Sequence, residues 1–465
     1  MLISQLMPHV SKRLRGESRH GCELLLAIIS GILLALSYPL FNLYFLAWVA
    51  LLPLLFAVEN KNIYHSFSLG WLTGFSMFIG QIWWFKVFHI IIPFILSAYL
   101  ALYFGLFCLL YNFVKKKNNI SELLIVPALW ISIEYIRSIG IWGFPAGLLG
   151  YSQYLNLPMI QIASLTSVFG VSFLVVLANV AIYLLLKNIP MRRKILISSS
   201  VGMILIAVLL FGLITVNQQP SGQKLTVAAV QPNVKEKNYN VHKVLNDLEK
   251  LSLKAAQSKP DLIIWPETIV RENLRMSPEL AQRVYQIVKK TNAYLLLGNK
   301  DLVSGQHYNS AFLVSPQGQV IGQYNKVRPI IFWENYPIRY ILPFLKNVEE
   351  KGRCDPGCDY TIFKIPKAKF ATLICFEGIF PDLSRRFVND GAQFLVNIAN
   401  DGWSGSKAEH YQHASMDVFR AIENRVYYVR VGNTGVTEVI SPVGRIVAEL
   451  PIYQSGYLVK EILLK

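Results

Sequence analysis

Long apolar runs separated by short polar stretches make up most of the first 216 residues. Seven such runs occupy about 24–40, 42–57, 65–85, 89–113, 122–137, 158–186 and 195–216. Each is near the roughly 20 residues that an α-helix needs to cross the hydrocarbon core of a bilayer. The pattern therefore predicts a bundle of about seven transmembrane helices over 1–216, with a re-entrant or interfacial segment in the Gly- and Pro-containing stretch 140–158.

After a polar break at 217–223 the pattern changes to short β-rich runs that alternate with amphipathic stretches, which is typical of an α/β domain. Strands are expected at 225–230, 262–265, 294–297, 310–314, 320–324, 370–376, 394–398, 436–440 and 445–448. Helices are expected at 241–258, 277–291, 381–390 and 409–428. So many strands in one continuous segment predict a single two-sheet domain over 217–465.

Basic residues are distributed unevenly among the loops between the apolar runs. When the spans alternate, two basic residues, Lys86 and Arg137, lie on one side of the membrane. The other side carries Lys12, Arg13, Arg15, Arg19, Lys61, Lys115, Lys116, Lys117, Lys187, Arg192, Arg193 and Lys194. Because cytoplasmic loops are rich in Lys and Arg, the amino terminus is expected in the cytoplasm. After seven crossings the α/β domain lies outside it, in the periplasm of a multi-pass protein of a bacterial inner membrane.

The composition supports a membrane-embedded protein with a polar second half. Of 465 residues, 53% are hydrophobic and only 16% are charged, too apolar a balance for a soluble domain alone. The net charge is +17. Membrane topology explains the basic charge of the first half, whereas that of the second half could attract anionic lipid head groups, although a solvated basic surface is commoner. No basic stripe interleaved with aromatic residues occurs, so a nucleic-acid partner is not expected. We expect a monomer that uses no cofactor.

Two cysteines lie close together in the turn-rich stretch Arg353-Cys354-Asp355-Pro356-Gly357-Cys358. They could close a small disulfide loop if the domain faces an oxidising compartment, or remain two free thiols. The sequence leaves both alternatives open. A zinc site needs more ligands nearby, so no metal is expected.

A carboxylate, an ammonium and a thiol follow three strand-like runs of the second half: Glu267, Lys326 and Cys375. A thiol with a reference pKa of roughly 8.5 is mostly protonated at neutral pH, so a cysteine nucleophile needs a base or a positive neighbour. Glu267 is placed to accept the Cys375 proton. The Lys326 ammonium can favour the thiolate and hold the oxyanion, with the backbone N–H after Cys375 as a second donor. This set of groups suits acyl transfer through a thioester.

In this order and with these flanks, the three residues resemble the catalytic Glu, Lys and Cys of the nitrilase, or carbon–nitrogen hydrolase, superfamily. The resemblance implies an α-β-β-α sandwich with these residues after successive strands. It also implies supporting roles for Glu334, which matches a glutamate after the family lysine, and for Phe376 and Glu377, which follow the nucleophile. Further local matches are Asn400-Asp401-Gly402-Trp403, His413, 420–425 and 432–435.

The first half resembles the opening of bacterial apolipoprotein N-acyltransferases at 34–42, 46–50, 143–145, 149–153 and 170–174. This resemblance implies that an acyl chain passes from a membrane phospholipid to Cys375, and then to the α-amino group of the diacylglyceryl-cysteine of an apolipoprotein. It predicts substrate contacts at Tyr239, Trp333, Trp403 and His413. Family members commonly end with another transmembrane helix, whereas 451–465 contains no span, so the carboxyl terminus is expected to stay outside the cytoplasm.

Two rival functions use the same residues differently. A membrane-anchored amidase or nitrilase would hydrolyse a C–N bond with the same triad and water as the acceptor. A bundle of seven spans disfavours this, because one span would anchor a hydrolase. A catalytically silent lipid-binding or assembly module is disfavoured by the presence of all three catalytic residue types.

One pair of ionisable residues falls inside an apolar run. Glu134 and Arg137 lie three positions apart near the outer end of the fifth run, where charged groups are costly unless paired or facing water. They could form a helix-end pair that reaches the membrane interface. Alternatively, they could line a polar site that receives a lipid head group.

Overall fold

The computed structural model covers residues 1–465, and the residues described here are 21–115, 119–140, 143–218, 221–235, 237, 239–330, 334 and 353–465. The chain divides into two compact units. The first comprises Met1–Ile162 and Val168–Gly212, and the second comprises Ala163–Ser167 and Leu213–Lys465. Each unit is described separately below.

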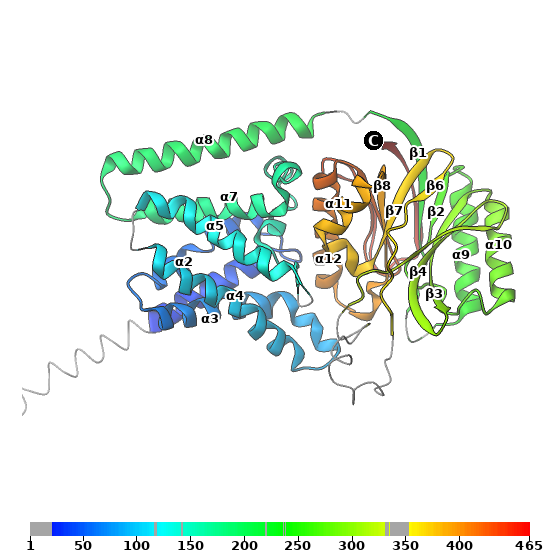
Figure 1. Ribbon diagram of the computed structural model, residues 1–465, viewed down its shortest axis with the longest axis horizontal. Coiled ribbons are helices and arrows are strands. Elements are labelled where there is room, and N and C mark those ends of the chain that lie inside the picture. The colour runs from blue at the N-terminus through cyan, green and yellow to red at the C-terminus, as the bar shows by residue number, and fades with distance from the viewer. Residues whose placement is uncertain are drawn as a thin grey trace, which may run out of the picture. The chain divides into compact units, whose positions relative to one another are not determined.

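The amino-terminal part of the chain is helical (Figure 1). Its α-helices are Gly21–Leu36, α2 (Leu52–Ala57), α3 (Ile63–Ile82), α4 (Ile92–Val114), α5 (Asn119–Ser138), α6 (Leu157–Ile160), α7 (Ala163–Leu186) and α8 (Met191–Val216). Short 3₁₀ turns are η1 (Tyr44–Trp48), η2 (Trp83–Val87) and η3 (Leu149–Gln153). Within the described residues, three helices are long and apolar enough to cross a membrane: α4, α7 and α8.

The apolar run at 42–57, expected as one span, is not one helix. It forms η1 and the six-residue α2, which begins next to Pro53. Proline lacks an amide hydrogen and fits the first turn of a helix, so it favours a new helix start over continuation. The expectation of one continuous helix is therefore wrong for this run, which is broken between η1 and α2.

The stretch expected as re-entrant contains irregular backbone that is buried in protein. All five residues of η3 are buried. The Gly150 N–H donates to Ser172 Oγ at 2.8 Å, and Trp48 Nε1 donates to Gln153 Oε1 at 2.9 Å. Irregular backbone in an apolar setting needs such protein partners, because unsatisfied polar groups are costly there.

Two six-stranded sheets form the core of the carboxyl-terminal unit. The first has the order β12-β1-β2-β3-β4-β5, with β1 (Gln223–Gln231), β2 (Leu262–Ile264), β3 (Tyr294–Val303), β4 (Gln306–Val314), β5 (Val320–Asn325) and β12 (Gly456–Leu464). The second has the order β11-β10-β9-β8-β7-β6, with β6 (Phe363–Ile365), β7 (Ala368–Ile374), β8 (Phe394–Ala399), β9 (Tyr427–Gly432), β10 (Thr437–Ile440) and β11 (Ile446–Leu450).

Helices cover the outer faces of both sheets, as Figure 1 shows. α9 (Val241–Ala256) packs on β1 and β12, and α10 (Pro278–Thr291) packs beside α9. α11 (Pro381–Asn389) and α12 (Lys407–Asn424) pack on the second sheet. The inner faces meet where β1 contacts β9 and β4 contacts β7. The architecture is the α-β-β-α sandwich that the nitrilase resemblance implies.

Most of the expected strands and helices occur, but three strands were missed: β6, β9 and β12. β9 is buried along its whole length, so it lacks the alternating pattern of a half-buried strand, and the helix expected at 409–428 overlaps its first two residues. That helix ends at Asn424, because Arg425 takes a left-handed conformation (φ 54°). β12 lies in 451–465 and pairs antiparallel with β1, a contact between distant parts of the chain.

Candidate active site

Glu267, Lys326 and Cys375 come together in the second unit, each at the end of a strand. Glu267 follows β2, Lys326 follows β5, and Cys375 follows β7 directly. β5 runs in the same direction as β2 because β3, β4 and β5 are successively antiparallel and β2 is parallel to β3. The carboxyl ends of β2 and β5 therefore lie at one edge of the first sheet. Lys326 Nζ is 3.6 Å from Glu267 Oε1, and all three side chains are buried.

Neighbouring groups fix the Glu267 carboxylate from two sides. Asn309 Nδ2 donates to Oε1 at 2.7 Å, and the Asn400 N–H donates to Oε2 at 2.9 Å. The backbone of β3 approaches closely here, because a Cβ on Gly298 would lie 2.6 Å from the Glu267 Cα. Burial raises the pKa of Glu267, while the Lys326 ammonium acts to lower it.

Lys326 is fully buried between two carboxylates. Its Nζ lies 2.9 Å from Glu334 Oε1 and 2.8 Å from Oε2. Glu334 Oε2 also accepts the Ile330 N–H at 2.8 Å. Burial acts to lower the pKa of Lys326, but the charges of Glu334 and Glu267 outweigh it and hold that pKa well above its usual range. Lys326 is therefore a fixed positive charge and not a base.

Cys375 sits at a sharp change in backbone direction. It has a φ of 52°, which is uncommon for a residue with a side chain, and it begins the 3₁₀ turn η7 (Cys375–Ile379). Burial raises the pKa of its thiol well above the usual value, and the Glu267 carboxylate adds to this, while Lys326 acts in the opposite direction. The thiol is therefore protonated at rest, so attack on a carbonyl requires a proton acceptor beside it.

Glu377 connects the turn at Cys375 to the segment after Lys326. Its Oε2 accepts the Ile374 N–H at 2.8 Å, and its Oε1 accepts the N–H groups of Val327 at 2.8 Å and Arg328 at 3.0 Å. The Tyr324 hydroxyl donates to the same carboxylate at 2.9 Å. The side chain is completely buried. Glu377 therefore fixes the two segments that carry Cys375 and Lys326 relative to each other.

Other residues predicted to belong to the site have different surroundings. The Phe376 ring packs edge-on against Phe380, with centroids 5.6 Å apart. Trp403 is half-buried and is the last residue of η8 (Asp401–Trp403). This turn directly follows Asn400, whose N–H donates to Glu267. The Tyr239 hydroxyl donates to Glu272 Oε2 at 2.8 Å and accepts the Arg271 N–H at 2.9 Å.

Trp333 lies outside the described residues. His413 is buried on α12, and its Nε2 lies 3.2 Å from the Cys375 carbonyl oxygen. Both of its ring nitrogens lie at protein partners, which is unlike the predicted substrate contact. A role for His413 through Cys375 is argued below.

Several buried polar residues around the site were not identified from the sequence as site residues. Asn309 on β4 binds Glu267, and Asn397 on β8 donates to the Cys375 carbonyl at 3.1 Å. Asp401 Oδ1 lies 4.0 Å from the Cys375 sulfur, and its Oδ2 accepts from Arg430 at 2.6 Å. A lone Asn within an apolar strand gives no sequence signal, whereas the Asn400-Asp401-Gly402-Trp403 match already pointed to Asp401.

Cys375, Asp401 and His413 offer ligand atoms within 4.8 Å of one another, a spacing that a metal ion could use. Asp401, Glu409 and His410 form a similar group. However, Arg430 Nη2 lies 2.6 Å from Asp401 Oδ2 and 3.0 Å from His413 Nδ1. The positive charge of Arg430 contacts both Asp401 and His413, and it repels a divalent cation that these residues would bind. The arrangement fits an ion-pair and hydrogen-bond network better than a metal centre.

Cys354 and Cys358 are free thiols in the structure, Cys354 buried and Cys358 exposed. Their segment borders the candidate site through its backbone. The Cys354 N–H donates to the Glu334 carbonyl, and the Gly357 N–H donates to the Lys326 carbonyl, each at 2.8 Å. The segment thus supports the residues that surround the lysine.

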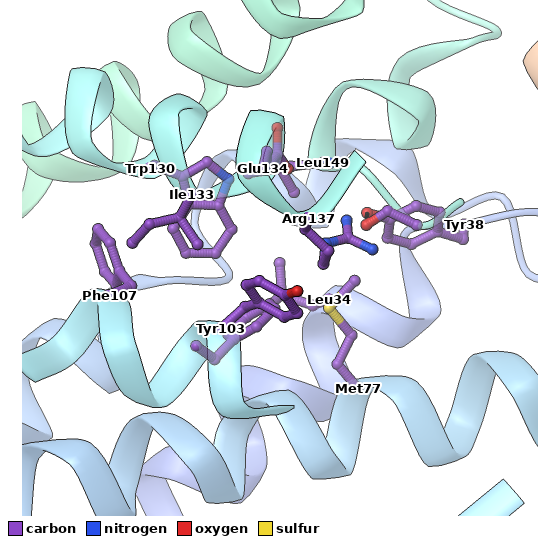
Figure 2. A pocket seen from close by; sticks show the side chains of 12 residues that line it. Leu34, Tyr38, Met77, Tyr103, Phe107, Trp130, Ile133, Glu134, Arg137 and Leu149 are labelled. Atoms are coloured by element: carbon purple, nitrogen blue, oxygen red, sulfur yellow. Dashed lines mark hydrogen bonds between the residues drawn. The ribbon is translucent and has the colours of Figure 1, made fainter. Parts of the chain in front are cut away.

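A second buried charged group occurs in the helical unit, where Glu134 and Arg137 line a cavity with Tyr38, Tyr103 and mostly apolar side chains (Figure 2). Arg137 Nη1 donates to the carbonyls of Phe144 at 3.0 Å and Ala146 at 2.7 Å. Glu134 Oε1 accepts the Leu149 N–H at 2.7 Å.

Burial of both side chains contradicts the interpretation of Glu134 and Arg137 as a pair that reaches the membrane interface. The cavity has about 20 Å³ of space for the centre of a water molecule, which suits a water and not a lipid head group. The two residues instead hold the irregular loop between α5 and η3.

Comparisons with known proteins agree across both parts of the chain. Residues 30–181 match the family model of the apolipoprotein N-acyltransferase N-terminal domain, and residues 226–465 match that of carbon-nitrogen hydrolases. A solved amidase from Nesterenkonia sp. is 17% identical and covers 52% of this chain and 92% of its own, with a TM-score of 0.42, which is too low to add support.

Two relatives are similar to this chain over nearly its whole length. An apolipoprotein N-acyltransferase of Geobacter metallireducens is 36% identical over 95% of this chain and 89% of its own length. Apolipoprotein N-acyltransferase 1 of Treponema denticola is 30% identical over 95% of this chain and 90% of its own. At this identity and coverage, the chain belongs to the apolipoprotein N-acyltransferase family.

Proposed function

We propose that this protein transfers an acyl chain from a membrane phospholipid to the α-amino group of the N-terminal diacylglyceryl-cysteine of apolipoproteins. The reaction follows a ping-pong mechanism through a thioester on Cys375. The observation that carries the proposal is the convergence of Glu267 and Lys326 beside the buried Cys375 thiol. The name apolipoprotein N-acyltransferase, borne by relatives that match nearly the whole chain, supports the acceptor.

In the first half-reaction, the Cys375 sulfur attacks the ester carbonyl carbon of the phospholipid while the thiol proton passes to Glu267. The negative charge that develops on the carbonyl oxygen is stabilised by the Lys326 ammonium and the backbone N–H of Phe376. The carbon–oxygen ester bond then breaks. The departing lysophospholipid oxygen takes the proton from Glu267, and a thioester remains.

In the second half-reaction, the neutral α-amine of the apolipoprotein attacks the thioester carbon and gives a proton to Glu267. The carbon–sulfur bond breaks, and the Cys375 thiolate recovers that proton. The products are an amide and the free thiol, so one residue accepts and returns the proton in each half. Glu334 holds Lys326 in place during both halves.

The compartment and the domain boundary belong to the same proposal. The apolar helices support a membrane protein. We place a bundle of about seven spans in 1–216 and the acyl-transfer domain in 217–465, in the periplasm of a bacterium with two membranes. The basic loops support this orientation. A reporter enzyme fused after Lys465 should be active outside the cytoplasm, and cytoplasmic activity would overturn the orientation.

The mechanism is tested by mass measurement of the purified protein after incubation with phospholipid. The peptide that contains Cys375 should gain the mass of one acyl chain, and a diacylated lipopeptide should then remove it as an amide. The Cys375→Ser variant should gain nothing. Cys354→Ser is the matched control, since it removes another buried thiol of the same domain and should leave the adduct intact.

Two results would contradict the proposal. An adduct on another residue, or no adduct in a preparation that acylates lipopeptide, would exclude the Cys375 thioester. Release of the adduct by water but not by the lipopeptide would favour the rival hydrolase, which uses the same three residues.

A further inference from the structure

The backbone carbonyl of Cys375 accepts hydrogen bonds from two buried side chains. Asn397 Nδ2 on β8 lies 3.1 Å from this oxygen, and His413 Nε2 on α12 lies 3.2 Å from it. Both side chains come from the second sheet and its covering helix. The mechanism above uses neither of them.

A carbonyl held in this way also fixes the amide that follows it. In a trans peptide the C=O and the next N–H are coplanar and point in opposite directions, and the structure contains no cis peptide among the described residues. Two donors on the Cys375 oxygen therefore determine where the Phe376 N–H points. We propose that Asn397 and His413 are positioning residues that aim this N–H at the oxyanion formed during acyl transfer.

The two donors are themselves held by buried groups. His413 Nδ1 lies 3.2 Å from Asp401 Oδ1, and Arg430 anchors Asp401 through Oδ2 and Asp417 through its other terminal nitrogen at 2.8 Å. Asn397 Nδ2 also lies 3.1 Å from the Tyr428 hydroxyl. Side chains supported in this way hold a fixed geometry, which is what a catalytic donor requires.

Gly378 allows this approach. A Cβ at this position would lie 2.3 Å from Asn397 Nδ2, which is closer than real contacts allow. The positive φ of Cys375 also costs free energy, because a residue with a side chain is crowded in the left-handed conformation. The surrounding hydrogen bonds must offset this cost, so the turn is held by its neighbours.

Electrostatics strengthen the contact made by His413. Burial and Arg430 act to lower the pKa of His413, but the Asp401 carboxylate outweighs them and raises it to about 9. Because a carbonyl oxygen can only accept, His413 Nε2 carries a proton and donates it to the Cys375 oxygen. This donor polarises the peptide and makes the Phe376 N–H a stronger donor.

The inference rests on the proposed function and is tested by comparing two reactions of Cys375 in the full-length protein. Acylation by a p-nitrophenyl ester of a fatty acid passes through an oxyanion, whereas alkylation by iodoacetamide does not. His413→Leu should slow acylation on the order of 10- to 100-fold, somewhat less than the deletion of an oxyanion donor costs. Alkylation at Cys375, measured by peptide mass, should change less than about 3-fold, because the thiol itself is unaltered.

Two further variants separate positioning from folding. His413→Gln keeps an N–H at the same distance along the side chain and should recover most of the acylation rate. Asn397→Asp keeps the size but places an oxygen against the carbonyl, so it should slow acylation selectively. His410→Leu is the matched control, because His410 is fully buried on the same helix and bonds to Glu409. In His410→Leu, the rates of acylation and alkylation at Cys375 should fall by the same factor or stay unchanged.

The outcomes distinguish the inference from the function on which it rests. Equal losses of acylation and alkylation in the His413 and Asn397 variants, or no rescue by His413→Gln, would overturn the positioning role alone. Absence of ester acylation at Cys375 in the unmodified protein would overturn both. A loss of acylation that exceeds the loss of alkylation, and that His413→Gln restores, supports both the positioning role and the proposed function.

Discussion

Both units bury a glutamate together with a basic residue, but the partners of these charges differ. In the helical unit, Glu134 and Arg137 bond to backbone groups of the loop at 144–149. In the sandwich, Lys326 bonds to Glu334 and lies 3.6 Å from Glu267, beside the Cys375 thiol. Burial of a charge is costly in both places. Charges bound to backbone fix a loop, whereas charges that surround a thiol change its pKa.

The largest effect is expected at the base. Glu267→Gln removes the proposed proton acceptor for the Cys375 thiol and should lower the turnover of lipopeptide acylation by about 10²–10⁴-fold. Glu134→Gln is the matched change in the helical unit, and it should keep the turnover per folded molecule within about 2-fold. The contrast between the units fails if both variants lose activity to the same extent.

A loss of stability, and not of chemistry, is expected at Arg137. Arg137→Met leaves the Phe144 and Ala146 carbonyls without their donor, which should lower the free energy of unfolding by about 2–4 kcal/mol. Thermal unfolding in detergent measures this, with turnover corrected for the folded fraction. Unchanged stability together with weaker binding of phospholipid would instead restore the interpretation as a head-group site.

The smallest effect is a shift in pH dependence. Glu267 must be ionised to act as a base, so the rate falls as pH decreases through its raised pKa. The charge of Glu334 contributes to raising that pKa, so Glu334→Gln should lower the pKa of Glu267 and move the acid limb of Cys375 acylation to lower pH. Glu272 is a carboxylate that accepts a hydrogen bond from Tyr239, and Glu272→Gln should leave the acid limb of the pH profile unchanged. A shift to higher pH in the Glu334 variant would contradict this assignment.

Many of the elements could be predicted because their signals are local. The strands that precede Glu267, Lys326 and Cys375 were expected near their observed positions, although the last ends at Ile374 and not 376. Its end is set by the positive φ of Cys375, which no residue pattern announces. β12 is not predicted because it is defined by pairing with β1 at the other end of the domain, and β9 is not predicted because a fully buried strand lacks an alternating pattern. Similarly, nothing near Asn397 or His413 in the sequence indicates that both reach the Cys375 carbonyl.

The sequence by itself determined which chemical groups are available and in which order the elements follow, since apolar periodicity and strand-end residues depend on near neighbours along the chain. Only the tertiary structure decided which buried groups satisfy each other: Glu334 with Lys326, Glu377 with the turn at Ile374, and Arg137 with the loop before η3. The physical reason is that a buried polar atom must find a partner wherever packing places one, and packing joins residues that are far apart in the sequence.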